Sequence, residues 1–420
     1  MGKMIELSLH AFSYGGEAIG RHKDKTVFVP YAIPGERVRV ELVEEAAHYS
    51  RARLVKVLDP SPSRVEPPCP YFGAEGCGGC QLQHIAYPVQ ARLKGLVVAD
   101  QFRRIGKFEE PPVLEPIADE TGWEYRNHAR LRVTEEGRPG FLSANSHDVV
   151  PVEDCLILHP LLRELYTSLD MVQPDIEQME LRVGTATGDL MLVLQTIDEE
   201  PPVLEVDFPM SIVQVCHDTV SAPLIGLDYI TEEIHGRPFR ISATSFYQVN
   251  TAMAGQLVDL VLEALDLDGD EKVLDAYCGV GLFSAFLSQA TGSVLGIEIN
   301  PAAVADARYN LRDAENVTFM EGQVEELLPE IEGPIDAVVL DPPRSGVERE
   351  TLDALLALGP ARIAYVSCDP ATLARDARRI VDAGYTLEWV QPVDLFPQTY
   401  HIETCVLLSH KNPQTSPPSL

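Results

Sequence analysis

The chain has 420 residues, of which 45% are hydrophobic and 23% are charged. The composition is that of a globular protein and excludes collagen-like or wholly disordered chains, while the length predicts two or three domains. The sequence has neither an apolar run long enough to span a membrane nor an N-terminal secretory signal, so we expect a cytoplasmic protein without a membrane partner.

The net charge is −31, and the 33 basic residues comprise 8 lysines and 25 arginines. Strong negative charge disfavours binding to nucleic acid in general. The excess of acidic residues lies after residue 110, however, and the first 110 residues are close to neutral. An RNA partner therefore requires local basic surface. The candidates are Arg37, Arg39, Arg51, Arg53, Arg126, Arg130 and Arg132.

Residues 4–58 show the pattern of short β-strands. Apolar and polar residues alternate over 5–9 and 37–43, and further apolar runs cover 26–29 and 52–58. Glycine pairs and a Pro-Gly step mark turns between these runs. The spacing predicts a five-stranded barrel of the oligonucleotide-binding kind, and any other small β domain is the alternative.

A group of three cysteines, Cys69, Cys77 and Cys80, follows a proline-rich linker. The chain has 8 cysteines, too few and too scattered for a disulfide framework, so this group favours a metal site. Cysteine ligands suit zinc and iron–sulfur clusters alike, and the residues alone leave both open. Next along the chain we expect a helix over 87–105 and an irregular, β-rich region over 124–225.

After about residue 236 the pattern changes to short buried strands that alternate with helical stretches. Nearly continuous apolar runs cover 272–277, 293–298, 335–341 and 362–367. Parallel strands that are covered on both faces have this appearance. The C-terminal part is therefore predicted to be a doubly wound, Rossmann-like α/β domain.

A glycine-containing loop follows the first of these strands. Gly279 and Gly281 allow a close backbone approach to a ligand, and Glu298 ends the next strand, where an acid can hold ribose hydroxyls. A dinucleotide is disfavoured, because residue 284 is Ser rather than the third glycine and Asp275 precedes the loop. The pattern predicts a ligand with an adenosine and no phosphates, such as S-adenosylmethionine. The alternative is that Glu298 is only a surface residue.

Three reactive side chains are expected at the same edge of the sheet. Asp341 and Cys368 each follow a strand, and Glu403 opens the last one. A thiolate that adds to C6 of uracil makes C5 nucleophilic toward a methyl sulfonium, and a base then removes the C5 proton. In this hypothesis Cys368 is the nucleophile, Glu403 is the base and Asp341 binds the edge of the uracil. The alternative is that Cys368 is a core residue, as expected for Cys278 and Cys405.

Six motifs together resemble those of one known family. They are the cysteine motif at 69–84, Ser245-Phe-Tyr-Gln-Val-Asn, Asp275-Ala-Tyr-Cys-Gly-Val-Gly, Asp341-Pro-Pro-Arg-Ser-Gly, Ser367-Cys-Asp-Pro and His401-Ile-Glu-Thr. Over almost its whole length the chain resembles the RNA uracil-5-methyltransferases, most closely those that act on 23S ribosomal RNA and carry an iron–sulfur cluster.

The resemblance implies a TRAM RNA-binding β-barrel at 1–60, a central iron–sulfur domain at 61–235 and an S-adenosylmethionine-dependent methyltransferase domain at 236–420. It implies methyl transfer to C5 of a uridine through a covalent bond between Cys368 and C6, with Glu403 as the base. Contacts with S-adenosylmethionine or the target base are expected from Gln248, Tyr277, Gly279, Glu298, Gln323 and Asp341. A 4Fe-4S cluster is expected on Cys69, Cys77, Cys80 and Cys155.

Other functions stay open at this point. A 23S rRNA uridine is the favoured target, because the TRAM domain and the cluster accompany that specificity, and the T-loop uridine of tRNA is the alternative. A methyltransferase for exocyclic amines is disfavoured by Arg344, which stands where such enzymes carry an aromatic residue. The cysteine spacing disfavours a radical enzyme. A non-catalytic iron–sulfur RNA-binding protein would not need Cys368 and Glu403. The sequence does not indicate an oligomeric state.

Overall fold

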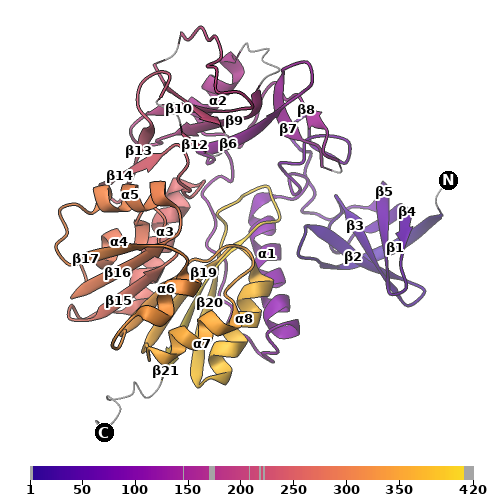
Figure 1. Cartoon of the computed structure of the whole chain (residues 1–420). Coiled ribbons are helices and arrows are strands. Elements are labelled where there is room, and N and C mark those ends of the chain that lie inside the picture. The colour runs from indigo at the N-terminus through magenta and orange to yellow at the C-terminus, as the bar shows by residue number, and fades with distance from the viewer. Residues whose placement is uncertain are drawn as a thin grey trace.

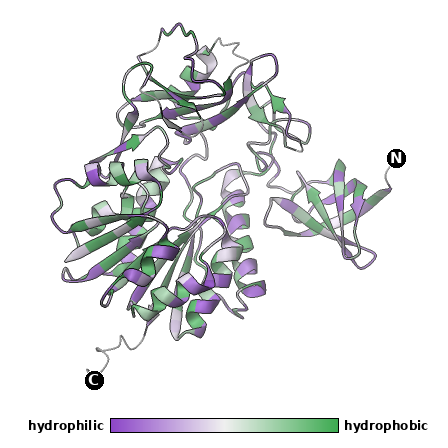
Figure 2. Cartoon of the chain, viewed as in Figure 1, coloured by the Kyte–Doolittle hydropathy of each residue, from purple (hydrophilic) through white to green (hydrophobic). Residues whose placement is uncertain are grey.

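The computed structural model describes residues 3–144, 146–169, 176–207, 209–216, 219–220 and 223–410. An N-terminal barrel, a central sheet and a larger C-terminal α/β unit follow one another along the chain (Figure 1). Hydrophobic residues concentrate on the strands of the C-terminal sheet, whereas the helices around it alternate between hydrophobic and hydrophilic faces (Figure 2). None of the described helices is both long enough and apolar enough to cross a membrane.

The N-terminal barrel closes in the strand order β1-β2-β3-β5-β4. Its described strands are β1 (Met4–Phe12), β2 (Glu17–His22), β3 (Lys25–Pro30), β4 (Arg37–Glu45) and β5 (Tyr49–Asp59). Successive side chains of a strand point to opposite faces, so alternate residues such as Ile5, Leu7 and Leu9 fill the interior. The predicted five-stranded barrel is confirmed.

The central unit is one mostly antiparallel sheet in the order β12-β11-β10-β9-β6-β7-β8 within the described residues. Leu162 and Leu165 of its helix α2 pack against sheet residues such as Leu181. This confirms the β-rich region expected over 124–225. The elements are β6 (His128–Val133), β7 (Pro139–Leu142), β8 (Val149–Val150), α2 (Pro160–Ser168), β9 (Ile176–Val183), β10 (Leu190–Thr196), β11 (Ser211–Cys216) and β12 (Thr219–Val220). A hairpin of β13 (Tyr229–Ile234) and β14 (Arg237–Ser242) then crosses the boundary expected at residue 236.

The C-terminal sheet has the order β17-β16-β15-β18-β19-β21-β20. Strand β21 runs antiparallel to β19 and β20, whereas the other described pairs are parallel. Its strands are β15 (Lys272–Ala276), β16 (Ser293–Glu298), β17 (Val317–Glu321), β18 (Ala337–Leu340), β19 (Arg362–Ser367), β20 (Tyr385–Val393) and β21 (Glu403–His410). Its helices are α3 (Thr251–Leu265), α4 (Leu282–Leu287), α5 (Pro301–Asn310), α6 (Val324–Leu327), α7 (Arg349–Ala357) and α8 (Pro370–Asp382). The order reverses at β15 and β18, so ligands are expected in the crevice at their carboxyl ends. The predicted doubly wound unit is confirmed.

The helix predicted over 87–105 is present as α1 (Tyr87–Arg104) and packs beside α8 (Figure 1). Val98 and Phe102 are buried in the core of the C-terminal unit. Lys94 is also fully buried, and its ammonium lies 2.6 Å from Asp394. A buried cation of this kind is tolerated because it is paired. The segment before the central sheet therefore contributes to the C-terminal core, while the expected domain boundaries at 60 and 236 stay predictions.

Candidate functional site

The glycine-containing loop after β15 is bound directly to the acid at the end of β16. The Gly279 amide donates to one oxygen of Glu298 at 3.0 Å, and the amide of Asn300 donates to the other at 2.7 Å. Tyr277 (φ 65°), Gly279 (φ 53°) and Gly281 (φ 83°) all have left-handed backbone conformations. Glycine adopts this conformation without strain, whereas Tyr277 stores strain at a site where backbone must approach a ligand.

Asp275, which precedes the glycine-containing loop, is bound to Ser284 of α4. Its Oδ2 accepts hydrogen bonds from the Ser284 amide at 2.9 Å and the Ser284 hydroxyl at 2.6 Å. Burial raises the pKa of Asp275 to about 7. The serine at the third glycine position of a dinucleotide motif therefore anchors α4 to β15, and Asp275 is a structural residue of the loop.

The other expected cofactor-binding side chains lie along the same edge. The Tyr277 hydroxyl donates to Glu325 at 2.7 Å, at the start of α6. The exposed Gln323 immediately precedes α6 and donates to Glu326 at 3.2 Å. The structure thus brings Tyr277, Gly279, Glu298 and Gln323 to the carboxyl ends of β15, β16 and β17, as expected.

Gln248 and Asp341 also meet. The Gln248 side-chain amide lies 3.5 Å from Asp341 Oδ2, which follows β18. The central unit holds the Gln248 segment, because Asn127 donates to the Gln248 carbonyl at 2.9 Å and Arg182 donates to the Ser245 carbonyl at 2.7 Å. Burial raises the pKa of Asp341, and Asp275 and Glu298 raise it further.

Cys368 and Glu403 come together through the pairing of two strands. Cys368 directly follows β19, Glu403 begins β21, and the register pairs Ser367 with Thr404. Burial, together with the Glu403 carboxylate, raises the pKa of the half-buried Cys368 thiol to about 11. Burial also raises the pKa of Glu403 well above its usual range, and Asp341 adds to this effect. The edge therefore places one thiol and two carboxyls together, and burial raises the pKa of each of them.

The four cysteines expected to bind metal line one cavity of about 110 Å3. Cys155 reaches it from the segment after β8, far along the chain from Cys69, Cys77 and Cys80. Burial and the neighbouring thiols raise the pKa of Cys80 to about 12. Among the described residues, no group of three or more His, Cys, Asp or Glu side chains has the arrangement to hold a metal ion. The four cysteines thus line one shared space.

Comparison with known proteins decides the family. Residues 212–411 match the family model of tRNA (Uracil-5-)-methyltransferase, and residues 1–55 match that of the TRAM domain. An RNA methyltransferase of Halalkalibacterium halodurans is 38% identical, with 97% of each chain covered. Another RNA methyltransferase, from Streptomyces avermitilis, is 36% identical, and the match covers 97% of this chain and 98% of that protein. The chain belongs to the RNA uracil-5-methyltransferase family.

A solved structure supports the same conclusion for this methyltransferase. The Pyrococcus abyssi tRNA (uracil-54, C5)-methyltransferase in complex with S-adenosyl-L-homocysteine superimposes with a TM-score of 0.77 at 26% identity, covering 96% of this chain and 100% of that one. The resemblance inferred from the motifs is confirmed, and the chain is an S-adenosylmethionine-dependent enzyme with an N-terminal TRAM barrel. The alternative of a non-catalytic RNA-binding protein is set aside.

Arg344 is a residue of the methyltransferase site that the sequence analysis used only to disfavour a rival. It lies three residues after Asp341 and close enough to Cys368 for its positive charge to act on the thiol. The cation lowers the pKa values of both Cys368 and Glu403 against the effect of burial. Arg344 is the basic residue of the loop that Pro342 and Pro343 fix after Asp341. This position in the sequence could have indicated that it lies in the site.

We expect Arg344→Gln to slow alkylation of Cys368 by iodoacetamide at pH 8 by about threefold or more, because the neighbouring cation favours the thiolate. Mass spectrometry of the Cys368 peptide over a pH series measures the rate. Arg349→Gln is the matched control, since Arg349 is exposed on α7 and lies 3.9 Å from Asp353. Equal rates in the two variants would contradict this role for Arg344.

The barrel arginines expected to bind RNA are engaged with carboxylates. Arg39 lies 2.8 Å from Glu6, and Arg51 lies 2.6 Å from Glu17, while Arg53 pairs with Glu41. Exposed ion pairs contribute little to stability, so such arginines can exchange a carboxylate for a phosphate at small cost. The barrel surface is therefore less positive than the sequence suggested.

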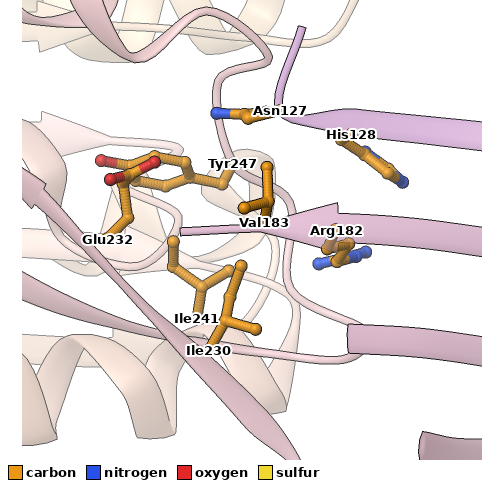
Figure 3. A pocket seen from close by; sticks show the side chains of 8 residues that line it. All are labelled: Asn127, His128, Arg182, Val183, Ile230, Glu232, Ile241 and Tyr247. Carbon is orange, nitrogen blue, oxygen red and sulfur yellow. The ribbon is translucent and has the colours of Figure 1, made fainter. Parts of the chain in front are cut away.

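A small cavity lies behind the segment that carries Gln248 (Figure 3). Its volume is about 20 Å3, enough for one water molecule. Figure 3 shows Glu232 beside Tyr247 on one side and Arg182 on the other. Among the described residues, the buried hydroxyl of Tyr247 and the buried Nε of Arg182 have no hydrogen-bond partner. This cavity is too small to hold a substrate.

Proposed function

We propose that this methyltransferase acts on C5 of a uridine through a covalent bond between Cys368 Sγ and C6 of the base. The single observation that carries the proposal is the pairing of β19 with β21, which joins Cys368 and Glu403 at the edge where Gly279 and Glu298 meet. A thiol and a base beside a methyl-donor loop are what alkylation of this carbon requires.

The residues divide the work as follows. Arg344 favours the Cys368 thiolate, whose electron pair forms the bond to C6 and leaves negative charge on C5 and the O4 oxygen. S-adenosylmethionine supplies the methyl group that C5 accepts. Glu403 then takes the C5 proton, the electrons of the C5–H bond restore the double bond, and the C6–S bond breaks to return the thiolate. Gln248 and Asp341 bind the uracil edge.

RNA that carries 5-fluorouridine tests this chemistry. The C5 fluorine cannot leave as a proton, so the enzyme and RNA are expected to stay joined on a denaturing gel in the presence of S-adenosylmethionine. The product from ordinary RNA is expected to be 5-methyluridine by mass spectrometry. Methylation on a nitrogen or oxygen atom, or the absence of an adduct, would refute the proposal.

The favoured substrate is a uridine of 23S rRNA, since the chain combines a TRAM barrel with a cavity lined by four cysteines. The T-loop uridine of tRNA is the second candidate, because the Pyrococcus abyssi structure is that of a tRNA (uracil-54, C5)-methyltransferase. Mapping of 5-methyluridine in both RNAs from a strain that lacks the gene decides between them: loss from rRNA alone supports the first, and loss from tRNA alone supports the second.

A 4Fe-4S cluster on Cys69, Cys77, Cys80 and Cys155 is part of the proposal. A single zinc ion holds sulfur at about 2.3 Å and therefore needs the four thiols close together. A 4Fe-4S cluster takes four cysteine ligands, which matches the four cysteines that line the cavity of about 110 Å3. When bound, the cluster would clamp the distant Cys155 to the Cys69–Cys80 loop. The methyl transfer itself needs no redox step.

We expect anaerobically purified protein to be brown and to contain iron and acid-labile sulfide. Cys155→Ser is expected to lose most of both and to unfold at a lower temperature, because the link between the two segments is lost. Cys216→Ser is the matched control, since Cys216 is buried on β11 of the central sheet and does not line the cavity. Colourless protein with stoichiometric zinc would refute the cluster.

A further inference from the structure

The tip of the β1–β2 hairpin of the barrel touches the catalytic edge. The Tyr14 hydroxyl donates to Asp369 Oδ2 at 3.0 Å, across 355 residues of sequence. Its ring meets that of Tyr400 edge-on, with centroids 6.1 Å apart. At Gly16 (φ +79°), a Cβ would lie 3.1 Å from Cβ of Tyr400 and 3.3 Å from Leu82. Only glycine allows the hairpin to approach this closely.

Asp369 is the residue that fixes the position of Cys368. Its Oδ1 accepts the amides of Ala371 and Thr372, both at 2.9 Å, and so caps the N-terminus of α8. Its own amide donates to the Ser367 hydroxyl at 3.2 Å. Cys368 therefore lies between two anchored neighbours, and Tyr14 occupies the carboxylate oxygen that the helix cap leaves free.

The hairpin contacts the segment of the proposed base as well. Tyr400 packs against His401, with ring centroids 4.2 Å apart, and Glu403 follows two residues later. Tyr14 thus touches both segments that carry the reactive pair. Burial and the Asp369 carboxylate raise the pKa of Tyr14 far above its usual value, so the hydroxyl stays a donor at every pH at which the enzyme is handled.

We infer that Tyr14 is a positioning residue, through which the TRAM barrel holds the loop of Cys368 in its reactive arrangement. The barrel then completes the catalytic edge in addition to any contact that it makes with RNA. This inference rests on the proposed role of Cys368 as nucleophile. Tyr14 acts through Asp369 and does not itself transfer a proton.

Tyr14→Phe removes the hydroxyl and keeps the ring. We expect kcat to fall by about tenfold, KM for RNA to change by less than about twofold, and the fall to be equal at all pH values, since a hydrogen bond to a carboxylate is lost. Tyr49→Phe is the matched control, because Tyr49 lies on the same barrel and donates to the exposed Glu44 at 3.1 Å. A rise in KM at constant kcat would show an RNA contact instead and overturn the inference.

Alkylation of Cys368 by iodoacetamide in the free enzyme tests the inference without methyl transfer. Loosening of the loop is expected to make alkylation faster in Tyr14→Phe than in Tyr49→Phe. If wild-type protein forms no adduct with 5-fluorouridine RNA, the proposed function fails. The rate of Cys368 alkylation in the free enzyme still decides, in that case, whether Tyr14 holds the loop. Asp369→Asn, which keeps an oxygen for the helix cap, is expected to show the same increase if Tyr14→Phe proves unstable. Equal rates in all variants would overturn the inference.

Discussion

Replacement of Cys368 with alanine is expected to reduce methylation by at least about a thousandfold and to abolish the adduct with 5-fluorouridine RNA. Without the sulfur, C5 of uracil is too weak a nucleophile to accept a methyl group. Transfer of labelled methyl groups and denaturing gels measure the two effects. S-adenosylmethionine binding is expected to be unchanged, because Cys368 takes no part in the hydrogen bond between the Gly279 amide and Glu298.

Two other cysteines provide the comparison. Cys216→Ala removes a buried cysteine of the central sheet and should leave the rate unchanged. Cys278→Ala tests the buried thiol of the cofactor loop, whose pKa burial raises well above its usual value. An adduct that survives Cys368→Ala and is lost in Cys278→Ala would move the nucleophile to the cofactor loop and contradict the assignment.

Glu403→Gln is expected to have the second large effect, and of a different kind. Glutamine fits the same space but cannot accept the C5 proton, so the methylated adduct should form with ordinary RNA and fail to break down. Turnover should fall by about a hundredfold or more, while denaturation-stable adduct accumulates. Glu388→Gln on the neighbouring strand β20 is the matched control, since Glu388 is exposed and accepts a hydrogen bond from the Ser409 hydroxyl. Rapid turnover without accumulation would refute Glu403 as the base.

The pH dependence follows from the same residues. Burial raises the pKa of Glu403, and a carboxyl with a raised pKa becomes a base only as the pH increases. Burial and Glu403 also raise the pKa of Cys368, to about 11, so the thiolate fraction grows in the same direction. Wild-type turnover should therefore increase from pH 6 to pH 9. A rate that is flat or falls over this range would show that neither group limits the reaction.

The sequence predicted which residues lie at this edge of the sheet, because their place next to a buried strand is a local feature of the sequence. Buried parallel strands appear as continuous apolar runs, and the residue after each run must lie at the carboxyl edge, as Asp341 and Cys368 do. Glu403 lies at the same edge for a different reason, because it begins β21 and this strand runs antiparallel to β19. The local pattern does not show, however, that Asp275 would accept hydrogen bonds from Ser284 and so anchor α4.

What the sequence could not show are contacts between segments that are far apart. Tyr14 reads as an ordinary turn residue until the barrel is placed against α8, and Arg344 acquires its meaning only beside Cys368. The periodicity of α1 shows which face is apolar but not which core that face will join. The same holds for the barrel arginines, whose carboxylate partners lie on neighbouring strands.

The buried pair of Lys94 and Asp394 means that the catalytic unit is discontinuous along the chain. Removal of everything before residue 236 would leave Asp394 as an uncompensated charge in an apolar interior, a change that costs about 3–5 kcal/mol. It would also remove Leu114 and Ile117, whose amides donate hydrogen bonds to β20 at 2.9 Å each. Any transplant of the catalytic machinery into another protein therefore has to carry residues 87–117 with it.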